Sequence, residues 1–258
     1  MLLHLLCRTY RQCCPGRGIL PPVFRYWADS GSSFGRGRAE VVQSLREFHV
    51  SVRHRRYGAS VNIVVANVKG GVGKTTTAVY LAALAAEVGP VVLVDADPQA
   101  TAAEWLEEHP LAGVQLVEAP SERLVARAAE LGQGGLVVID TPPGSERIVR
   151  AALDAADVVL IPTRAGGVEV SRVRVTLGLV PDGVAAGVVI CSARTSTRDL
   201  RDTMDGWAAA GVRVWGVVPE RVGIAAGPDG DLNADGLSAY RSILEMIQVT
   251  LAPTSGAN

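Results

Sequence analysis

Short runs of apolar residues alternate along the chain with longer segments in which apolar and polar residues are mixed. Each run is about four to eight residues long and too short for an ordinary helix. Such runs, rich in Val, Ile and Leu, predict strands that are covered on both faces of a parallel sheet. The predicted strands are residues 61–68, 91–94, 114–117, 136–139, 157–161, 186–191 and 212–218.

The longer segments between these runs predict helices. They are residues 75–88, 100–108, 121–131, 145–154, 168–179, 197–210 and 237–251. Residues 75–88 are apolar on nearly all sides, so this helix is expected to lie between the sheet and a further layer. Strands that alternate with helices predict an α/β fold: a single doubly wound, mostly parallel sheet with helices on both faces. Ligands bind such sheets at the carboxyl ends of the strands.

Residues 1–58 do not follow this alternation, and we predict a low-complexity, basic extension there and one domain at residues 59–258. The first apolar patch is too short for a secretory signal core, and its arginines follow it instead of preceding it. Glycines and prolines then interrupt any periodicity, apart from a short helical pattern at residues 39–48. Three interpretations are open: a disordered basic arm that binds nucleic acid, a tail that binds a partner, and a start codon assigned too early.

The formal net charge of -1 hides a strong asymmetry. Residues 1–60 contain ten Arg and no Lys against three acidic residues, a net charge of +7, so the remaining 15 basic and 23 acidic residues carry -8. With 48% hydrophobic residues and no apolar run long enough to span a bilayer, the composition predicts a soluble globular protein. The cysteines have no metal-binding spacing, which favours a reducing, cytoplasmic compartment; they are Cys7, Cys13, Cys14 and Cys191.

Residues 69–77, KGGVGKTTT, follow the first predicted strand and open the first predicted helix. A strand, a glycine-rich turn and a helix N-terminus together form a phosphate-binding loop, because the glycines let backbone N–H groups wrap a phosphate. Lys74 would supply a mobile charge to the β and γ phosphates, and the Thr75 hydroxyl would bind magnesium. Lys69 is an additional lysine at the start of the loop. Lys69 and Lys74 are the only lysines of the chain. A genome that favours Arg codons accounts for most of this bias, but the two exceptions stand where a compact, flexible ammonium is suited and a planar guanidinium would not fit, which supports a function for both.

Three motifs closely resemble those of the ParA/MinD family of deviant Walker ATPases. They are KGGVGKTTT at residues 69–77, VVLVDADPQ at 91–99 and VVIDTPP at 137–143, in the family's order and spacing. The resemblance runs from about residue 61 to about residue 246. It implies the P-loop NTPase fold of the deviant Walker type, with ATP and Mg²⁺ as cofactors and slow, partner-stimulated hydrolysis.

The resemblance also implies roles for three carboxylates. Asp95 would help to organise the magnesium shell, Asp97 would position the attacking water, and Asp140 would lie against the magnesium shell. Asp95 and Asp97 follow the predicted strand at residues 91–94, and we expect their side chains to point to opposite faces, so that only one of them directly faces the metal region. The expected metal-binding residues are therefore Thr75, Asp95 and Asp140, and the expected catalytic residues are Lys69, Lys74 and Asp97. Residues 141–144, with two prolines, would form a second switch that responds to the γ phosphate.

In proteins that resemble this one, the lysine equivalent to Lys69 reaches across a dimer to the partner's nucleotide. The resemblance therefore implies an ATP-dependent homodimer. The segments that usually meet the adenine match at residues 191–193 and 219–222, but Ser192 and Glu220 stand where an amide or Arg is more typical. The expected nucleotide-binding residues are Lys69, Gly70, Gly71, Val72, Gly73, Lys74, Thr75, Thr76, Pro219 and Arg221.

The leading functional interpretation is a partition-type ATPase that distributes a plasmid, a chromosome region or another cargo over the nucleoid. The family resemblance implies nonspecific DNA binding and a ParB-like or ribbon-helix-helix partner, in the cytoplasm and without a membrane. The candidate DNA-binding residues are Arg194, Arg198, Arg201, Arg213 and Arg221. Acidic residues are interleaved with the arginines of residues 198–205, so an ordinary salt-bridged surface is the open alternative there.

Three other functions are weighed against this interpretation. A MinD-like membrane positioner calls for a basic amphipathic C-terminal helix, whereas no cation follows Arg241. An ATP-dependent metabolic ligase on the same fold would leave the DADPQ sequence unexplained. A regulator that binds nucleotide without hydrolysing it would differ from the leading interpretation only in its lack of ATPase activity. The iron–sulfur carriers of the same superfamily are disfavoured because no CxxC spacing occurs.

Overall fold

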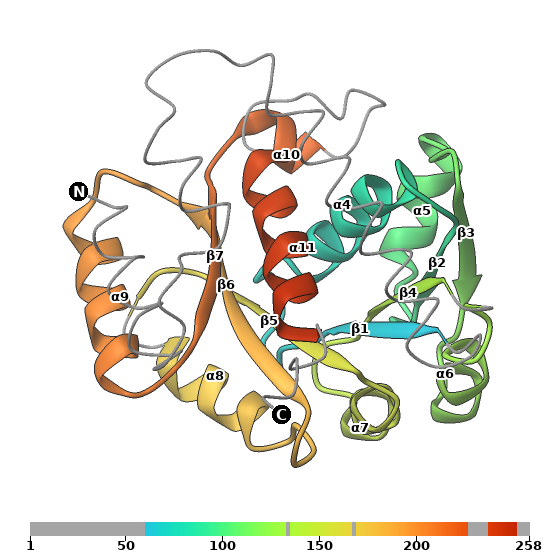
Figure 1. The fold of residues 1–258 in the computed structure, drawn as a ribbon, viewed down its shortest axis with the longest axis horizontal. Helices are drawn as coiled ribbons and strands as arrows, with labels where there is room; N and C mark the ends of the chain where they lie inside the picture. Colours follow the sequence, from blue (N-terminus) through green and yellow to red (C-terminus); the bar gives the residue numbers. More distant parts are fainter. Residues whose placement is uncertain (1–59, 133–134, 167–168, 227–236, 252–258) are drawn as a thin grey trace, which may run out of the picture.

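A seven-stranded sheet with the strand order β3-β2-β4-β1-β5-β6-β7 forms the centre of the molecule (Figure 1). The computed structural model describes residues 60–132, 135–166, 169–226 and 237–251. All neighbouring strands are parallel, so the predicted α/β fold is confirmed. The strands are β1 (Val61–Val65), β2 (Val91–Asp95), β3 (Val114–Glu118), β4 (Leu136–Asp140), β5 (Val158–Thr163), β6 (Ala185–Ala193) and β7 (Val214–Pro219).

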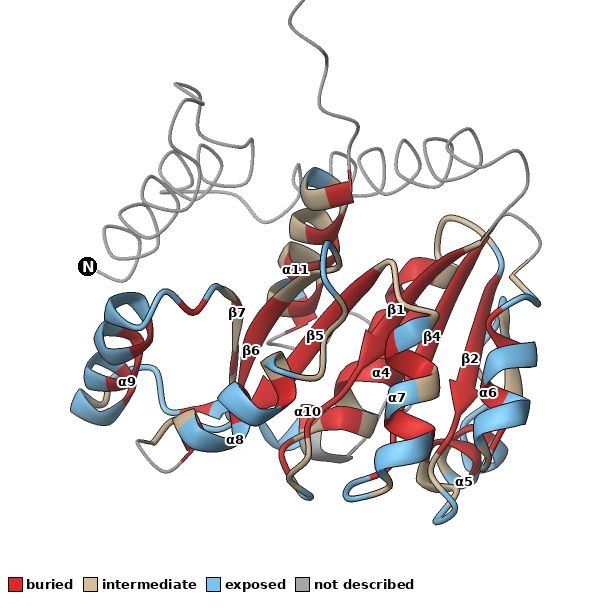
Figure 2. Cartoon of the chain, turned by 90° about the horizontal axis from the view of Figure 1, so that it is seen from below, coloured by how far each residue is buried: buried red, intermediate tan, exposed pale blue. Residues whose placement is uncertain are grey.

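The helices lie on both faces of this sheet, as the sequence predicts. One face is covered by α4 (Lys74–Ala86), α5 (Thr101–Glu108), α10 (Val222–Ala226) and α11 (Leu237–Leu251). The other is covered by α6 (Glu122–Ala128), α7 (Glu146–Asp154), α8 (Glu169–Leu177) and α9 (Arg198–Ala209). Figure 2 shows the buried strands between these layers and the exposed outer faces of the helices. The short helix α10 was not predicted.

Alternate residues of each central strand enter the two hydrophobic layers. In β1, Ile63 and Val65 pack under α4 and α11, whereas Val64 packs on the opposite side, toward α7. All three side chains are fully buried. Because both faces of the strand are covered, no polar face is required, and this explains the continuous apolar run in the sequence.

Helix α4 is enclosed, as its apolar sequence predicts. Its residues from Thr77 to Ala85 are all buried between the sheet and α11. Tyr80 of α4 stacks on Tyr240 of α11 with ring centroids 5.4 Å apart. In the part of the chain that the structure describes, no helix is long and apolar enough to cross a membrane.

Strand β1 ends three residues before the predicted limit at residue 68. After Val65 only the Ala66 N–H continues the ladder, donating to the Leu160 carbonyl at 2.9 Å. The Asn67 side chain then donates to the Pro162 carbonyl at 2.8 Å, and the chain turns away from the sheet. The apolar run therefore supplies both the strand and the entry to the glycine-rich loop. The predicted extension at residues 1–58, with its helical pattern at 39–48, lies outside the described residues.

Candidate nucleotide-binding site

Three strand ends form a level row beneath the glycine-rich loop. Asp140, at the end of β4, is the register partner of Val65 in β1 and of Asp95 in β2. Parallel pairing of three strands thus brings the three sequence motifs together, although they are far apart in the chain. The row lies at the carboxyl edge of the sheet, where ligands of doubly wound folds bind.

The loop is shaped by two glycines with left-handed backbone conformations. Gly71 has φ of 68° and Gly73 has φ of 95°, a region that residues with a side chain rarely adopt. Gly73 is the N-cap of α4, and its carbonyl accepts the Thr77 N–H at 2.9 Å. The first N–H groups of α4 have no partner within the helix and are directed toward the loop, as anion binding at a helix N-terminus requires.

Lys74 lies inside this loop. It is 6% exposed, and its Nζ donates to the Lys69 carbonyl at 3.1 Å, so the side chain folds back along the loop. Desolvation lowers the pKa of Lys74, while the nearby carboxylates of Asp140 and Asp97 raise it. A desolvated ammonium with only a carbonyl partner has donors left for an anionic ligand.

Thr75 and Asp140 meet at the base of the loop. The Thr75 hydroxyl donates to Asp140 Oδ2 at 2.6 Å, and Asp140 Oδ1 is buried without a hydrogen-bond partner. Burial raises the pKa of Asp140 to about 7, against the opposing effect of the Thr75 hydrogen bond. A hydroxyl and a carboxylate oxygen without a partner suit Mg²⁺, which takes oxygen ligands and commonly keeps water and phosphate in its shell. No group of three His, Cys, Asp or Glu residues able to hold a metal occurs among the described residues, so the protein would supply only part of such a shell.

Asp95 and Asp97 differ in exposure and in bonding. Both carboxylate oxygens of the buried Asp95 accept backbone N–H groups, from Asp97 at 3.1 Å and from Ala103 in α5 at 3.0 Å. Burial raises the pKa of Asp95 in spite of these bonds. Asp97 is half-buried, and its Oδ1 accepts the Gln99 N–H at 3.0 Å.

The expected placement of Asp95 and Asp97 on opposite faces has no basis in strand geometry, because residues two apart in a strand share a face and β2 already ends at Asp95. The charges of both carboxylates raise the pKa of Asp140, so both lie close to it. Asp95 holds the turn between β2 and α5 together, and Asp97 is the more accessible carboxylate beside Lys74.

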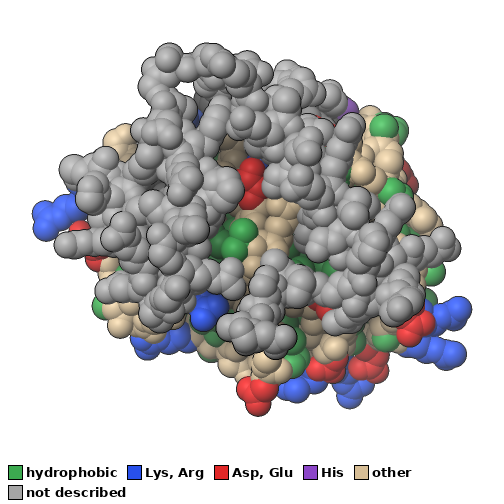
Figure 3. Space-filling model, in the orientation of Figure 1, with side chains coloured by type: hydrophobic (Ala, Val, Ile, Leu, Met, Phe, Trp, Pro, Cys, Tyr) green, Lys and Arg blue, Asp and Glu red, His purple; other side chains and the backbone are tan. Residues whose placement is uncertain are grey.

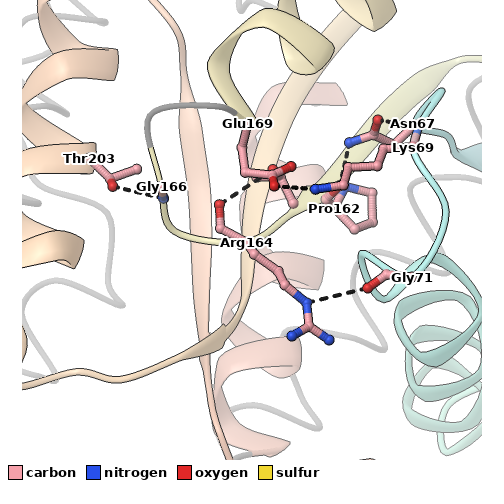
Figure 4. A network of polar contacts seen from close by, with 9 residues as sticks. Asn67, Lys69, Gly71, Pro162, Arg164, Gly166, Glu169 and Thr203 are labelled. Atoms are coloured by element: carbon pink, nitrogen blue, oxygen red, sulfur yellow. Dashed lines mark hydrogen bonds and ion pairs between the residues drawn. The ribbon is translucent and has the colours of Figure 1, made fainter.

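Lys69 lies at the outer end of the loop and points away from its interior (Figure 4). Its side chain is 42% exposed and forms an ion pair with Glu169 in the first turn of α8. Its backbone N–H donates to Asn67 Oδ1 at 2.9 Å. The loop after β5 contributes a further contact, since Arg164 Nε donates to the Gly71 carbonyl at 3.3 Å. The start of the loop is thus held by the segment that joins β5 to α8.

The predicted second switch lies beside the loop. The Thr141 hydroxyl is buried and donates to the Val65 carbonyl at 2.9 Å. A Cβ atom added to Gly70 would lie 3.6 Å from the Pro143 side chain, so these two residues are close neighbours. Gly144 has φ of 76° and ends the segment before α7.

The ends of β6 and β7 lie next to the same loop. Cys191 of β6 is buried, and its Sγ is 3.7 Å from the Thr77 hydroxyl in α4. Pro219 is the register partner of Ala193 at the end of β6. The Tyr80 hydroxyl of α4 donates to the Gly223 carbonyl of α10 at 3.0 Å. The structure therefore places Pro219 and Arg221 at the same edge of the sheet as the phosphate loop, as a base-binding position requires.

The five arginines predicted to contact DNA do not form one cluster. Arg194 pairs with Glu220 at 2.9 Å, so Arg194 and the neighbouring Arg221 lie at the carboxyl ends of β6 and β7. Arg213 precedes β7 and is therefore at the opposite edge of the sheet. The predicted parallel strand at residues 212–218 already implies this separation, because Arg213 lies at its amino end and Arg221 beyond its carboxyl end.

The remaining two candidates, Arg198 and Arg201, are exposed on α9. Arg198 pairs with Asp202 at 3.5 Å, which is the salt-bridged arrangement that the interleaved acidic residues indicate. Arg201 has no ion pair within the described part of the chain. On the face shown in Figure 3, several of the visible Lys and Arg side chains lie next to Asp and Glu side chains, most clearly along the lower right rim.

Sequence reasoning missed two residues that hold Lys69. Glu169 falls inside the predicted helix at residues 168–179, where an acidic residue in the first turn is an ordinary feature. Asn67 lies in a segment predicted as strand. No periodicity or spacing marks either residue, because their roles depend on the approach of α8 and β5 to the loop.

We predict that Gly73→Ala lowers the free energy of unfolding by about 1–3 kcal/mol and weakens nucleotide binding, because a residue with a Cβ atom is strained in the left-handed conformation. The added Cβ would also lie 3.3 Å from the Cys191 side chain. Gly206→Ala in α9 is the matched control, since a Cβ there meets nothing within 4 Å and Ala favours a helix. Urea unfolding and fluorescent-nucleotide binding measure both effects. Equal stabilities of the two variants would contradict the prediction.

The chain is similar in sequence to a family of nucleotide-binding domains and to several of its members. The sequence model of the CobQ/CobB/MinD/ParA nucleotide binding domain matches residues 63–233. A maintenance of carboxysome distribution protein A from Gloeobacter kilaueensis is 38% identical over 147 residues, 55% of this chain and 67% of that protein. The chromosome-partitioning ATPase Soj from Thermus thermophilus is 30% identical over 240 residues, 72% of this chain and 94% of that protein.

Solved structures share the fold. A putative plasmid partition protein from Borrelia burgdorferi, bound to AMPPNP, superposes with a TM-score of 0.65 at 21% identity. The match covers 75% of this chain and 100% of that chain.

Proposed function

Because the chain belongs to the CobQ/CobB/MinD/ParA nucleotide-binding family, we propose that it is a partition-type positioning ATPase. In this proposal ATP and Mg²⁺ bind at the glycine-rich loop, two subunits dimerise on ATP, and the dimer binds DNA without sequence preference. Hydrolysis, stimulated by a ParB-like or ribbon-helix-helix partner, releases the dimer and moves a cargo over the nucleoid in the cytoplasm.

The observation that carries the proposal is the different placement of the two lysines of one loop. Lys74 is 6% exposed and folded along the loop interior, where it serves the nucleotide of its own subunit. The Lys69 side chain is 42% exposed at the outer end, where it can serve a second molecule. Binding of the nucleotide within one subunit needs only Lys74, so the exposed Lys69 is the lysine available for a second molecule.

The reaction at this site is positioning combined with electrostatic stabilisation. Lys74 holds its ammonium beside the phosphates, and the first N–H groups of α4 offset charge on them. Thr75 and Asp140 would hold the metal through the hydroxyl and the carboxylate oxygen that has no partner. Bound Mg²⁺ supplies positive charge against the phosphate oxygens. Asp97, the accessible carboxylate, would orient the attacking water, while Asp95 keeps the β2–α5 turn in place.

The DNA-binding part of the proposal rests on the family resemblance of the motifs more than on the charge of the described surface. Among the candidate arginines, Arg201 on α9 is exposed and has no ion pair within the described residues. DNA binding of this kind is dominated by phosphate contacts and weakens steeply as salt increases.

The test is cosedimentation of the full chain with nonspecific duplex DNA in the presence of ATP, ADP or no nucleotide, at low and moderate salt. We expect binding that requires ATP, decreases with salt and is lost in Lys69→Ala. Binding that is independent of nucleotide does not count, because the ten arginines of residues 1–60 can supply it.

Two results separate parts of the proposal. ATP-dependent dimerisation without DNA binding, measured by sedimentation velocity, would overturn the nucleoid role and leave the nucleotide switch in place. A Lys69→Ala variant that dimerises like the wild type would overturn the role of Lys69.

A further inference from the structure

Lys69 already has a partner within its own subunit. Its ammonium forms an ion pair with Glu169 Oε1 (Figure 4). Glu169 belongs to α8, which packs on the opposite side of the sheet from α4. The ion pair therefore joins the start of the phosphate loop to an element outside the loop.

Breaking the ion pair with Lys69 is unfavourable for the carboxylate of Glu169, because this carboxylate is buried. The residue is 8% exposed, and its second oxygen, Oε2, is buried without a hydrogen-bond partner. A buried carboxylate left without its cation is unfavourable, because the low-dielectric surroundings replace water only in part. The Lys69 side chain is much more exposed and can turn outward at little cost of its own. Most of the cost of breaking the pair falls on Glu169.

Nearby contacts keep Glu169 in position. Val68 N–H donates to the Thr176 hydroxyl of α8 at 3.3 Å, next to Lys69 in the chain. The Asn67 side chain is bonded both to the Lys69 N–H and to the Pro162 carbonyl at the end of β5. The start of the loop is thus connected to α8 by a backbone hydrogen bond as well as by the ion pair. These contacts keep Glu169 within reach of Lys69.

We propose that Glu169 is a positioning residue that holds Lys69 against its own subunit and competes with the use of Lys69 in the dimer. The inference rests on the proposed function, in which Lys69 serves the partner's nucleotide. In the subunit without a partner, Glu169 keeps Lys69 away from other anions. Dimerisation then exchanges one anionic contact of Lys69 for another, and the lost pair with Glu169 weakens the ATP-dependent dimer.

The ion pair can be tested without reference to dimerisation, because the chain has only two lysines. Limited acylation of the nucleotide-free full chain, followed by fragment-ion mass spectrometry, gives the labelling rate of each lysine. We expect Glu169→Gln to increase labelling of Lys69 about fivefold, the effect of removing one partly exposed ion pair. Glu146→Gln is the matched control, because Glu146 of α7 forms an exposed ion pair with Arg150 and not with a loop lysine.

The competition is tested by sedimentation velocity with a nonhydrolysable ATP analogue. Glu169→Gln is expected to tighten the dimer by about the same fivefold factor, whereas Glu146→Gln leaves it unchanged. Thermal unfolding of each variant shows whether the fold is retained, and the Lys74 labelling rate reports whether the loop itself is disturbed. A purely structural role for Glu169 would change stability and both labelling rates without tightening the dimer.

Each result has a definite meaning. Equal labelling of Lys69 in Glu169→Gln and in the wild type would overturn the pairing, and faster labelling with an unchanged or weaker dimer would overturn the competition. A wild type that does not dimerise with the ATP analogue would overturn the proposed function and the competition that rests on it. The labelling rates alone would still decide whether Glu169 holds Lys69.

Discussion

Lys74→Met is expected to lower the affinity for ATP by about 30- to 1000-fold, the effect of removing a desolvated cation that faces an anionic group. Lys74 is buried in the loop, and the only hydrogen bond of its ammonium in the described structure is to the Lys69 carbonyl. Methionine keeps most of the apolar stem and removes the charge, so the loop should remain packed. Titration with a fluorescent ATP analogue measures the affinity.

Lys69→Met is the matched control for this prediction, because it removes the other lysine of the same loop. Lys69 points outward to Glu169 and away from the loop interior, so nucleotide binding by the monomer should stay within about threefold of the wild type. The two variants should therefore separate binding from dimerisation. A Lys74→Met protein that binds ATP as well as the wild type would mean that the phosphates do not lie in this loop.

Asp140→Asn should have opposite effects on activity and stability. Mg²⁺-dependent ATP hydrolysis should fall by roughly 100-fold, since the amide is a weaker magnesium ligand than the carboxylate. The free energy of unfolding without nucleotide should instead rise by about 1–3 kcal/mol at pH 8. The carboxylate is fully buried, one of its oxygens has no partner, and burial raises its pKa to about 7.

The sign of the pH dependence follows from that raised pKa. Below the ordinary value of 3.8, Asp140 is protonated in both the folded and the unfolded protein, and the stabilisation of its neutral form is fully present. This stabilisation is lost as the pH rises through about 7, because the folded protein must then bury the ionised group. The advantage of Asp140→Asn should therefore be larger at pH 8 than at pH 5 in urea unfolding.

Asp154→Asn, at the exposed end of α7, is the matched control for the same chemical change. It should leave both hydrolysis and stability near the wild-type values, within about 0.5 kcal/mol. If Asp140→Asn destabilised the fold as well as the activity, the carboxylate would be making a net favourable contribution that its burial does not indicate.

The sequence predicts most of this architecture because its signals are local. Each buried strand is a continuous apolar run, and the three motifs that carry the family resemblance are contiguous segments. The family assignment from those motifs is confirmed by the family model, which matches residues 63–233. The left-handed conformations at Gly71 and Gly73 are also predictable in kind, since only glycine adopts them readily.

Features that depend on contacts between distant segments could not be predicted from the sequence. The end of β1 at Val65 depends on hydrogen bonds to β5, which an apolar run does not encode. The pairing of Lys69 with Glu169 depends on how α8 approaches the loop, 100 residues further along the chain. The pairing of Arg194 with Glu220 likewise depends on how the ends of β6 and β7 meet, 26 residues apart in the chain.

The level row of strand ends determines where the chain can change in length. Deleting one residue within β4 would turn Asp140 to the other face of the sheet and shift it by about 3.3 Å, away from Thr75. Length changes at the opposite edge, such as the turn at Gly211 between α9 and β7, leave this row untouched. For protein engineering, that turn is accordingly the place to insert a fluorescent protein or an affinity tag while keeping the nucleotide site intact.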